Sequence, residues 1–256
     1  MSGVWHLSVI KTIIMKNNTY KIKRPGSMIH TQRLALAGVL LALLAGCALP
    51  TRVDGGGNGN NAASDHPQMH AELIRDMLAQ HQYYAALAHI QEMQRTDGNT
   101  RELRFLEAET RRKLGQSAAA AQIYESLLGS EYAGQSYHGL GLLNADRDMA
   151  LAIQQLQKAV QLRPTDVQFR NDLGYALMVS HRYKEALTEL ATATELDQHS
   201  QLSRNNLIML LFITRDEAGA LRVARDSNVS DQELAGLRRQ AQDIVQTRPA
   251  RAGGVK

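Results

Sequence analysis

Small and bulky apolar residues recur along most of this chain at a nearly fixed interval. In the first four copies an alanine is followed by a bulky residue four positions later and by an apolar residue seven positions later, and the alanine returns after 34, 32, 34 and 34 residues. The alanines that mark it are Ala86, Ala120, Ala152, Ala186 and Ala220. Spacings of four and seven residues place side chains on one face of an α-helix. The pattern therefore predicts a series of similar helical units.

Each unit is long enough for two helices joined by a turn, and a small residue lets the two helices cross closely. Each pair then buries its other apolar face on the next pair, so the last pair needs a cap. Ser230 and Glu233 form a capping box at the start of a helix whose Leu234 and Leu237 share an apolar stripe. We expect about five helix pairs and this capping helix over residues 67–246. A compact four-helix bundle is the alternative, but it gives no reason for a sustained alanine register.

Two copies of the unit resemble the tetratricopeptide repeat (TPR) closely. In the better copy the residues in the expected positions are Leu173, Gly174, Leu177, Tyr183, Ala186, Leu190 and Ala193. In the copy before it they are Leu140, Gly141, Ala152, Leu156, Ala159 and Pro164. The predicted fold class is all-α: a TPR-like helical-hairpin solenoid with a C-terminal capping helix, preceded by a signal peptide and a flexible linker.

The signal peptide is predicted over residues 1–46. Arg33 precedes a run of 13 apolar or small residues, which is too short to cross ~30 Å of hydrocarbon as a helix and fits the apolar region of an export signal. Residues 1–27 are long for the leader of such a signal. We therefore expect translation to begin at Met28 and residues 1–27 to be an untranslated extension, with a long basic leader as the alternative.

The apolar run ends at the only cysteine of the chain, Cys47. Leu44, Ala45, Gly46 and Cys47 resemble a bacterial lipobox, which implies that Cys47 is lipidated and that cleavage occurs before it. Because residue 48 is alanine and not aspartate, the resemblance to lipoproteins of Gram-negative bacteria implies sorting to the outer membrane, on its periplasmic face. The alternative is an ordinary secretory signal with an incidental cysteine.

Two flexible segments flank the predicted solenoid. Residues 47–66 are rich in glycine and asparagine and have too few apolar side chains to form a core, so they are predicted to be a tether. A coil of this length spans about 20–25 Å on average. Residues 247–256 are predicted to be a disordered tail.

The charge distribution argues against nucleic acid as a partner. The whole chain has a net charge of +4, but residues 1–46 hold six basic side chains and no acidic one, so the exported part has 23 Lys and Arg against 25 Asp and Glu. A slightly acidic protein lacks the basic surface that nucleic acid requires. Glycine-rich phosphate loops and serine-nucleophile motifs are absent from the sequence, so no enzymatic activity, cofactor or metal site is predicted.

The resemblance to TPR solenoids places a concave binding groove on the first helices of the pairs. The main positions that it assigns to this groove are His138, Leu142, Asn171, Asp172, Tyr175, Asn205, Asn206 and Met209, and it also includes Gln135, Gln168 and Phe212. The carbonyl oxygen and the NH₂ group of an asparagine side chain can both form hydrogen bonds with a peptide backbone, while tyrosine and methionine offer adaptable apolar contact. Alternatively, Asn171 and Asn205 lie near helix starts and satisfy free backbone N–H groups there.

Residues 169–235 also resemble the TadD family of lipoproteins, which serve the assembly of Flp (tight adherence) pili. The resemblance rests on Arg170–Leu177, Tyr183–Leu190, Arg204–Leu207 and Val229–Ala235. It implies an outer-membrane scaffold whose protein partners are a secretin or other components of pilus assembly. The alternatives are a pilotin of type IV pili and a scaffold for envelope or peptidoglycan biogenesis.

Overall fold

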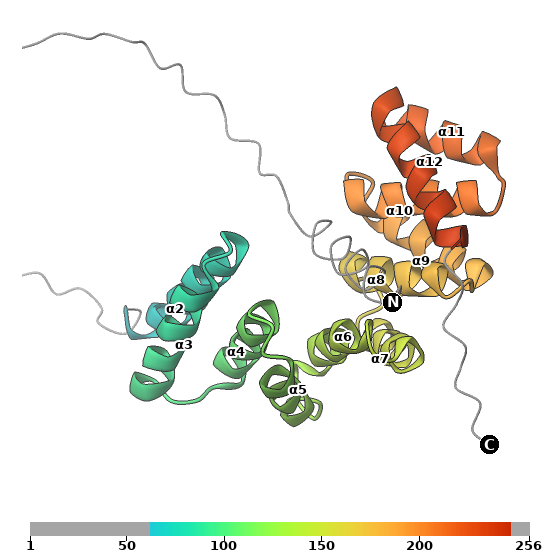
Figure 1. The fold of residues 1–256 in the computed structure, drawn as a ribbon. Helices are drawn as coiled ribbons and strands as arrows, with labels where there is room; N and C mark the ends of the chain where they lie inside the picture. Colours follow the sequence, from blue (N-terminus) through green and yellow to red (C-terminus); the bar gives the residue numbers. More distant parts are fainter. Residues whose placement is uncertain (1–61, 247–256) are drawn as a thin grey trace, which may run out of the picture.

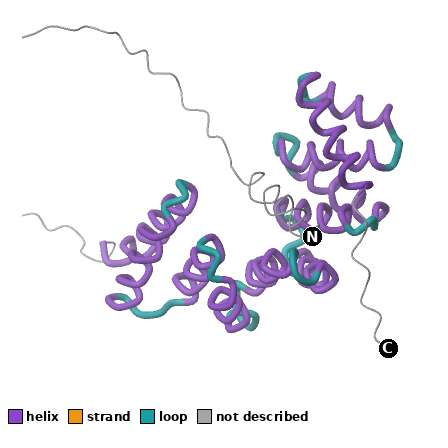
Figure 2. The backbone as a smooth tube through the Cα atoms, in the orientation of Figure 1, coloured by secondary structure: helices purple, strands orange, loops and turns teal. Residues whose placement is uncertain are grey.

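The computed structural model describes residues 62–246, with side chains from residue 68 onward, and all of its regular elements are helices. Figure 2 shows these helices joined by short loops. Their bounds are α2 (Ala62–Ala79), α3 (Tyr83–Thr96), α4 (Arg101–Lys113), α5 (Ser117–Ser126), α6 (Ala133–Asn144), α7 (Met149–Leu162), α8 (Val167–Val179), α9 (Tyr183–Leu196), α10 (Gln201–Ile213), α11 (Glu217–Asp226) and α12 (Asp231–Gln246). The predicted fold class, an all-α TPR-like solenoid, is confirmed.

The helices form five consecutive pairs, followed by α12. We call the first helix of each pair the A helix (α2, α4, α6, α8 and α10) and the second the B helix (α3, α5, α7, α9 and α11). The pairs follow one another along a curved array, in which α4 and α6 lie on the inner side of α5 and α7 (Figure 1). Each B helix from α3 to α9 packs both on its own A helix and on the A helix of the next pair. This arrangement is a solenoid and not a bundle around one closed centre.

The small residues of the repeat lie where the helices of a pair cross. All five marker alanines are fully buried in the B helices. In the α8–α9 pair, a methyl group added to Gly174 would lie 2.6 Å from Cγ of Leu190. In the α6–α7 pair, a methyl group added to Gly141 would lie 2.7 Å from Cγ of Leu156. The backbones therefore approach so closely that only glycine fits at these two positions of the A helices.

Four of the five turns from an A helix to its B helix share one conformation. Each contains one residue in the left-handed region, and these residues are His81, Gly115, His181 and Arg215, with φ between 60° and 76°. In the fourth pair, the N–H of Arg182 donates to the carbonyl of Leu177 at 2.9 Å. This is the Schellman motif, which satisfies the last carbonyls of a helix and stops it.

The α6–α7 turn differs because its repeat is shorter, with 32 residues between marker alanines and not 34. None of its residues has a positive φ. Instead, the N–H groups of Arg147 and Asp148 both donate to the carbonyl of Asn144. The carboxylate of Asp148 then accepts from the N–H of Leu151 at 3.0 Å and caps α7.

The predicted capping helix is confirmed as α12. The hydroxyl of Ser230 accepts from the N–H of Glu233 at 3.2 Å, which is one of the two bonds of a capping box. Leu237 and Ala241 are buried against the end of the array. α12 therefore covers the apolar face that the last pair would otherwise expose.

The N-terminal boundary differs from the prediction. α2 begins at Ala62, so residues 62–66 are helical and not the end of the tether. Ala62 and Ala63 favour a helix, and extending an existing helix costs less free energy than starting one. The predicted signal peptide, Cys47, the rest of the tether and the predicted tail lie in residues 1–61 and 247–256, outside the described residues. Within residues 62–246, none of the helices combines the length and the hydropathy needed to cross a membrane.

The close crossing of α8 and α9 can be tested with Gly174→Ala. The added methyl group would collide with Leu190, so we expect the free energy of unfolding to fall by about 1–3 kcal/mol. Urea denaturation followed by circular dichroism measures this loss. Gly129→Ala is the matched control, since nothing lies within 4 Å of its added methyl group. Equal free energies of unfolding for Gly174→Ala and Gly129→Ala would contradict the close contact of α8 with α9.

Candidate partner-binding groove

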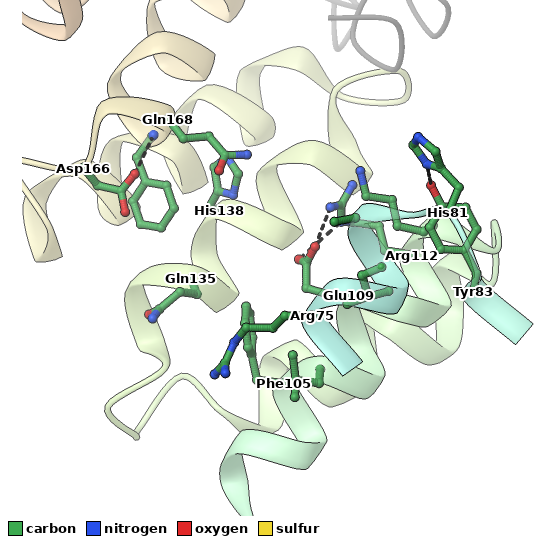
Figure 3. A pocket seen from close by; sticks show the side chains of 15 residues that line it. Arg75, His81, Tyr83, Phe105, Glu109, Arg112, Gln135, His138, Asp166 and Gln168 are labelled. Atoms are coloured by element: carbon green, nitrogen blue, oxygen red, sulfur yellow. Dashed lines mark hydrogen bonds and ion pairs between the residues drawn. The ribbon is translucent and has the colours of Figure 1, made fainter. Parts of the chain in front are cut away.

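A groove of about 420 Å³ lies on the A-helix side of the first four pairs. α2, α4, α6 and the start of α8 all contribute side chains to it (Figure 3). Its lining includes Phe105, Glu109, Arg112, Gln135, His138 and Phe169. Because each of four successive repeats contributes, the groove exists only when the repeats are stacked.

An ion pair between Glu109 and Arg112 lies at the wall of the groove. Nη2 of Arg112 and Oε2 of Glu109 are 2.6 Å apart, and both side chains are largely buried. Tyr124 of α5 donates its hydroxyl proton to Glu109, while Nε of Arg112 donates to the same hydroxyl at 3.3 Å. These bonds join α4 to α5 and hold the two charged side chains in place.

The pKa values of these groups follow from this arrangement. Burial acts to raise the pKa of Glu109, but the charge of Arg112 and the hydrogen bonds from Arg112 and Tyr124 outweigh it and lower the pKa to about 2. Burial, reinforced by the Glu109 carboxylate, raises the pKa of the Tyr124 phenol. Glu109 is therefore ionised and Tyr124 is neutral at physiological pH.

His138 forms the next part of the groove. Its Nε2 lies 2.8 Å from Oδ2 of Asp172 on α8, and its ring stacks on Phe169 with 4.5 Å between centroids. Asp166 fixes the start of α8 by accepting from the N–H of Phe169 at 3.2 Å. The cap of α8 thus positions the ring on which His138 stacks.

Four of the predicted groove residues lie between repeats and not on an open surface. Asn171, Tyr175, Asn206 and Met209 are each no more than 8% exposed. Nδ2 of Asn206 donates to Oδ1 of Asn171 at 2.8 Å, which joins α10 to α8. Burial raises the pKa of Tyr175 to about 12. In this structure these side chains contact neighbouring repeats, whereas three other predicted residues line the groove: Gln135, His138 and Gln168.

The remaining predicted residues are half-buried. Asp172 is engaged by His138, Leu142 lies on α6, and Nδ2 of Asn205 donates to Oε1 of Glu233 on the capping helix at 2.9 Å. The alternative role of Asn171 and Asn205 as helix caps is wrong. Asp166 caps α8 and Ser200 caps α10, since their side-chain oxygens accept from the backbone N–H three residues later.

The groove residues on α2 and α4 were not predicted from the sequence. Phe105, Glu109 and Arg112 follow one another at spacings of four and three residues, which places them on one face of α4. This spacing was the feature of the sequence that could have indicated a shared face for these three residues. Charged residues on a helix face are usually solvated, so only the approach of α2 and α6 shows that this face lines a groove.

Comparison with known proteins identifies the family. The tetratricopeptide repeat pattern matches residues 143–204. A TPR repeat-containing protein of Pseudomonas aeruginosa is 37% identical over 188 residues, which cover 73% of this chain and 75% of that protein. The chain belongs to the tetratricopeptide repeat family. Repeats of this kind build scaffolds with extended concave surfaces for binding other proteins.

Solved structures of TPR proteins resemble this chain. A thermophilic TPR protein of Thermus thermophilus shares the fold, with a TM-score of 0.51 and 18% sequence identity over 70% of this chain and 99% of that one. MamA from Desulfovibrio magneticus RS-1 has a TM-score of 0.49 and 16% identity, over 68% of this chain and 95% of that one.

The ion pair at the groove wall can be tested with Glu109→Gln. The change leaves the Arg112 guanidinium largely buried without its anion, so we expect a loss of about 3–5 kcal/mol in the free energy of unfolding at pH 7. Because the pKa of Glu109 falls from its ordinary 4.5 to about 2 on folding, its contribution is complete above pH 4.5 and disappears as the pH falls towards 2.

Chemical denaturation of both proteins from pH 7 to pH 2 measures this dependence. The free energies of unfolding of wild type and Glu109→Gln should become equal only as the pH approaches 2. Glu125→Gln, on the exposed face of α5, is the control and should change stability by less than about 0.5 kcal/mol. A difference between wild type and Glu109→Gln that stays constant over the whole range would exclude the assigned ion pair.

Proposed function

We propose that this protein is a lipid-anchored scaffold of the outer membrane, which binds a protein segment in its A-helix groove during the assembly of Flp pili or of their secretin. The observation that carries the binding role is the groove itself, in which four A helices present aromatic rings, charged groups and amides along one side of the array. A surface with mixed chemistry spread over several repeats suits an extended or helical protein segment.

The anchor in this proposal rests on the sequence. Cys47 ends an apolar run in a lipobox-like context, and 14 residues separate it from the start of α2. A tether of that length, as predicted from the sequence, would span about 20 Å on average. A lipid on Cys47 would therefore hold the first repeat and its groove close to the membrane surface. Several acyl chains are needed for stable attachment, and a lipoprotein carries several.

The pilus role rests on the resemblance of residues 169–235 to TadD lipoproteins. Its motifs lie in α8, α9, α10 and the start of α12. The structure gives these motifs a packing role, since Asn171 bonds Asn206 and Asn205 bonds Glu233. The partner is therefore identified by experiment. The alternative partners are a type IV pilus secretin and a peptidoglycan enzyme.

Photocrosslinking from the groove tests both the binding surface and the partner. We expect p-benzoylphenylalanine at Gln168, which lines the groove and is exposed, to capture a secretin or another Flp assembly protein in living cells. The same group at Gln154, an exposed glutamine of the B helix α7, is the matched control and should not capture it. Equal capture from both positions, or none from Gln168, would exclude the groove as the binding surface.

The anchor is tested by Cys47→Ser. Because this is the only cysteine, we expect complete loss of acyl labelling by a palmitate analogue and a shift from the outer-membrane fraction to the soluble periplasmic fraction. Removing the acyl chains removes about 0.8 kcal/mol of membrane affinity per buried CH₂. Unchanged labelling or fractionation would rule out the lipid anchor while leaving the groove untouched.

A further inference from the structure

Two histidines meet inside the first helix pair, at a position that another pair fills with an ion pair. Nδ1 of His70 on α2 lies 3.2 Å from Nε2 of His89 on α3, and both residues are half-buried. The residues 100 positions later are Arg170 and Glu189, whose charged groups are 2.6 Å apart. An arginine and a glutamate satisfy each other, whereas two neutral imidazoles share one proton and two protonated ones repel. The first pair therefore holds two nitrogen ligands where the α8–α9 pair holds an ion pair.

The geometry of the two rings fits a shared zinc ion. Zinc binds imidazole nitrogens at about 2.0–2.1 Å with tetrahedral angles, so two of its ligand nitrogens lie about 3.3 Å apart. Here the two ring nitrogens are 3.2 Å apart, and the ring centroids are 5.3 Å apart with the ring planes tilted by 50°. The right angle of a square-planar site would require about 2.8 Å at the same bond length. Small rotations of the two rings would therefore be enough to direct both nitrogens at one zinc ion.

The surroundings of the two histidines determine what completes the coordination. In the part of the chain whose side chains are described, no group of three or more potential metal ligands is present. Glu92, three residues after His89, is engaged by Arg95 at 2.5 Å. His66 lies four residues before His70 within α2, and this spacing places two residues on one face of a helix, as in the zinc-binding H-E-x-x-H motif. The face of α2 that carries His70 therefore carries a second histidine position, and the partial exposure of His70 and His89 gives water access to the site.

We propose that His70 and His89 bind a zinc ion that joins α2 to α3, with water in the remaining coordination positions. This site departs from the sequence-based expectation that the chain holds no metal. Zinc binds the neutral form of both rings, so the ring that donates the bond between them moves that proton to its other nitrogen. The coordination bonds then replace one hydrogen bond as the connection between the two helices.

The position of this site gives the metal a structural role. The first pair lies at the N-terminal end of the array (Figure 1) and has no pair before it, and its core is the small cluster around Ile74 and Ile90. At the other end of the array, α12 packs on the last pair. Zinc would stabilise the end that lacks such a helix. Because Arg75, Leu78 and Tyr83 of the first pair line the groove, the ion would also hold that end of the groove in place.

Zinc titration of the full-length protein by isothermal calorimetry tests this site. The protein carries Cys47→Ser and no polyhistidine tag, so that neither a free thiol nor a tag competes for the metal. We expect one zinc ion to bind per chain. The melting temperature should rise with zinc concentration, because the ion binds the folded pair and not the unfolded chain.

A matched variant exchanges the two histidines for the ion pair of the α8–α9 pair. The double substitution His70→Arg and His89→Glu keeps the helices joined and removes both imidazoles. Zinc binding should weaken about tenfold or more, and zinc should no longer raise the melting temperature. His199→Ala, at an exposed histidine between α9 and α10, is the control and should leave zinc binding unchanged.

The outcomes separate this site from the proposed binding function. Absence of zinc binding, or equal zinc affinity with and without the double substitution, would overturn the site. Anomalous scattering at the zinc edge from crystals grown with zinc should place the ion between His70 and His89, and an ion bound elsewhere would overturn the site as well. Capture of a partner from Gln168 tests the groove independently of the metal.

Discussion

The two helices of each pair meet where a side chain is smallest. Five alanines at an almost constant interval are fully buried, and Gly141 and Gly174 lie against leucines of the opposing helix with no room for a methyl group. Close crossing fixes the angle and the offset of each pair, because side chains on both helices must interdigitate around it. Since the pairs are alike, they stack in one direction and leave their A helices on one side of the array.

The two ends of the array differ, and this difference determines where the groove is open. At the C-terminal end, α12 packs on α10, and Glu233 accepts from both Gln201 and Asn205. The residues of α8 and α10 around the bond between Asn171 and Asn206 form part of the largest apolar core. Nearer the N-terminus the core divides into smaller clusters. The groove lies over this part of the array, where α2, α4, α6 and the start of α8 line it.

Much of the fold could be predicted from the sequence, because it depends on residues with one dominant physical role. At their spacings, the alanines and glycines of the crossings predict close helix packing, and Ser230 with Glu233 predicts a helix start. The start of α2 could not be predicted, because the helical residues 62–66 follow a polar segment without a distinct boundary. The short turn before Asp148 was visible as a shorter interval, but its hydrogen bonds to Asn144 were not.

The site was less predictable, for a reason that lies in the repeat itself. A repeat pattern assigns the same role to equivalent positions of every A helix, but burial differs along the array. Asn206 and Met209 occupy positions that the repeat pattern assigns to an open groove, yet here they are buried in the packing around α8 and α10. Conversely, Glu109 and Arg112 of α4 line the groove together with side chains of α2, α6 and α8. The role of such polar and charged residues becomes clear only when their neighbours are known.

Hydrogen exchange of the full-length protein, free and bound to the partner captured from Gln168, tests the central claim that the open A-helix side of the first four repeats is the binding surface. Binding on this side should add protection in α4, α6 and the start of α8, while α5, α7 and α9 exchange at the same rates in both states. Protection confined to the B helices, or to α12 at the far end, would contradict it.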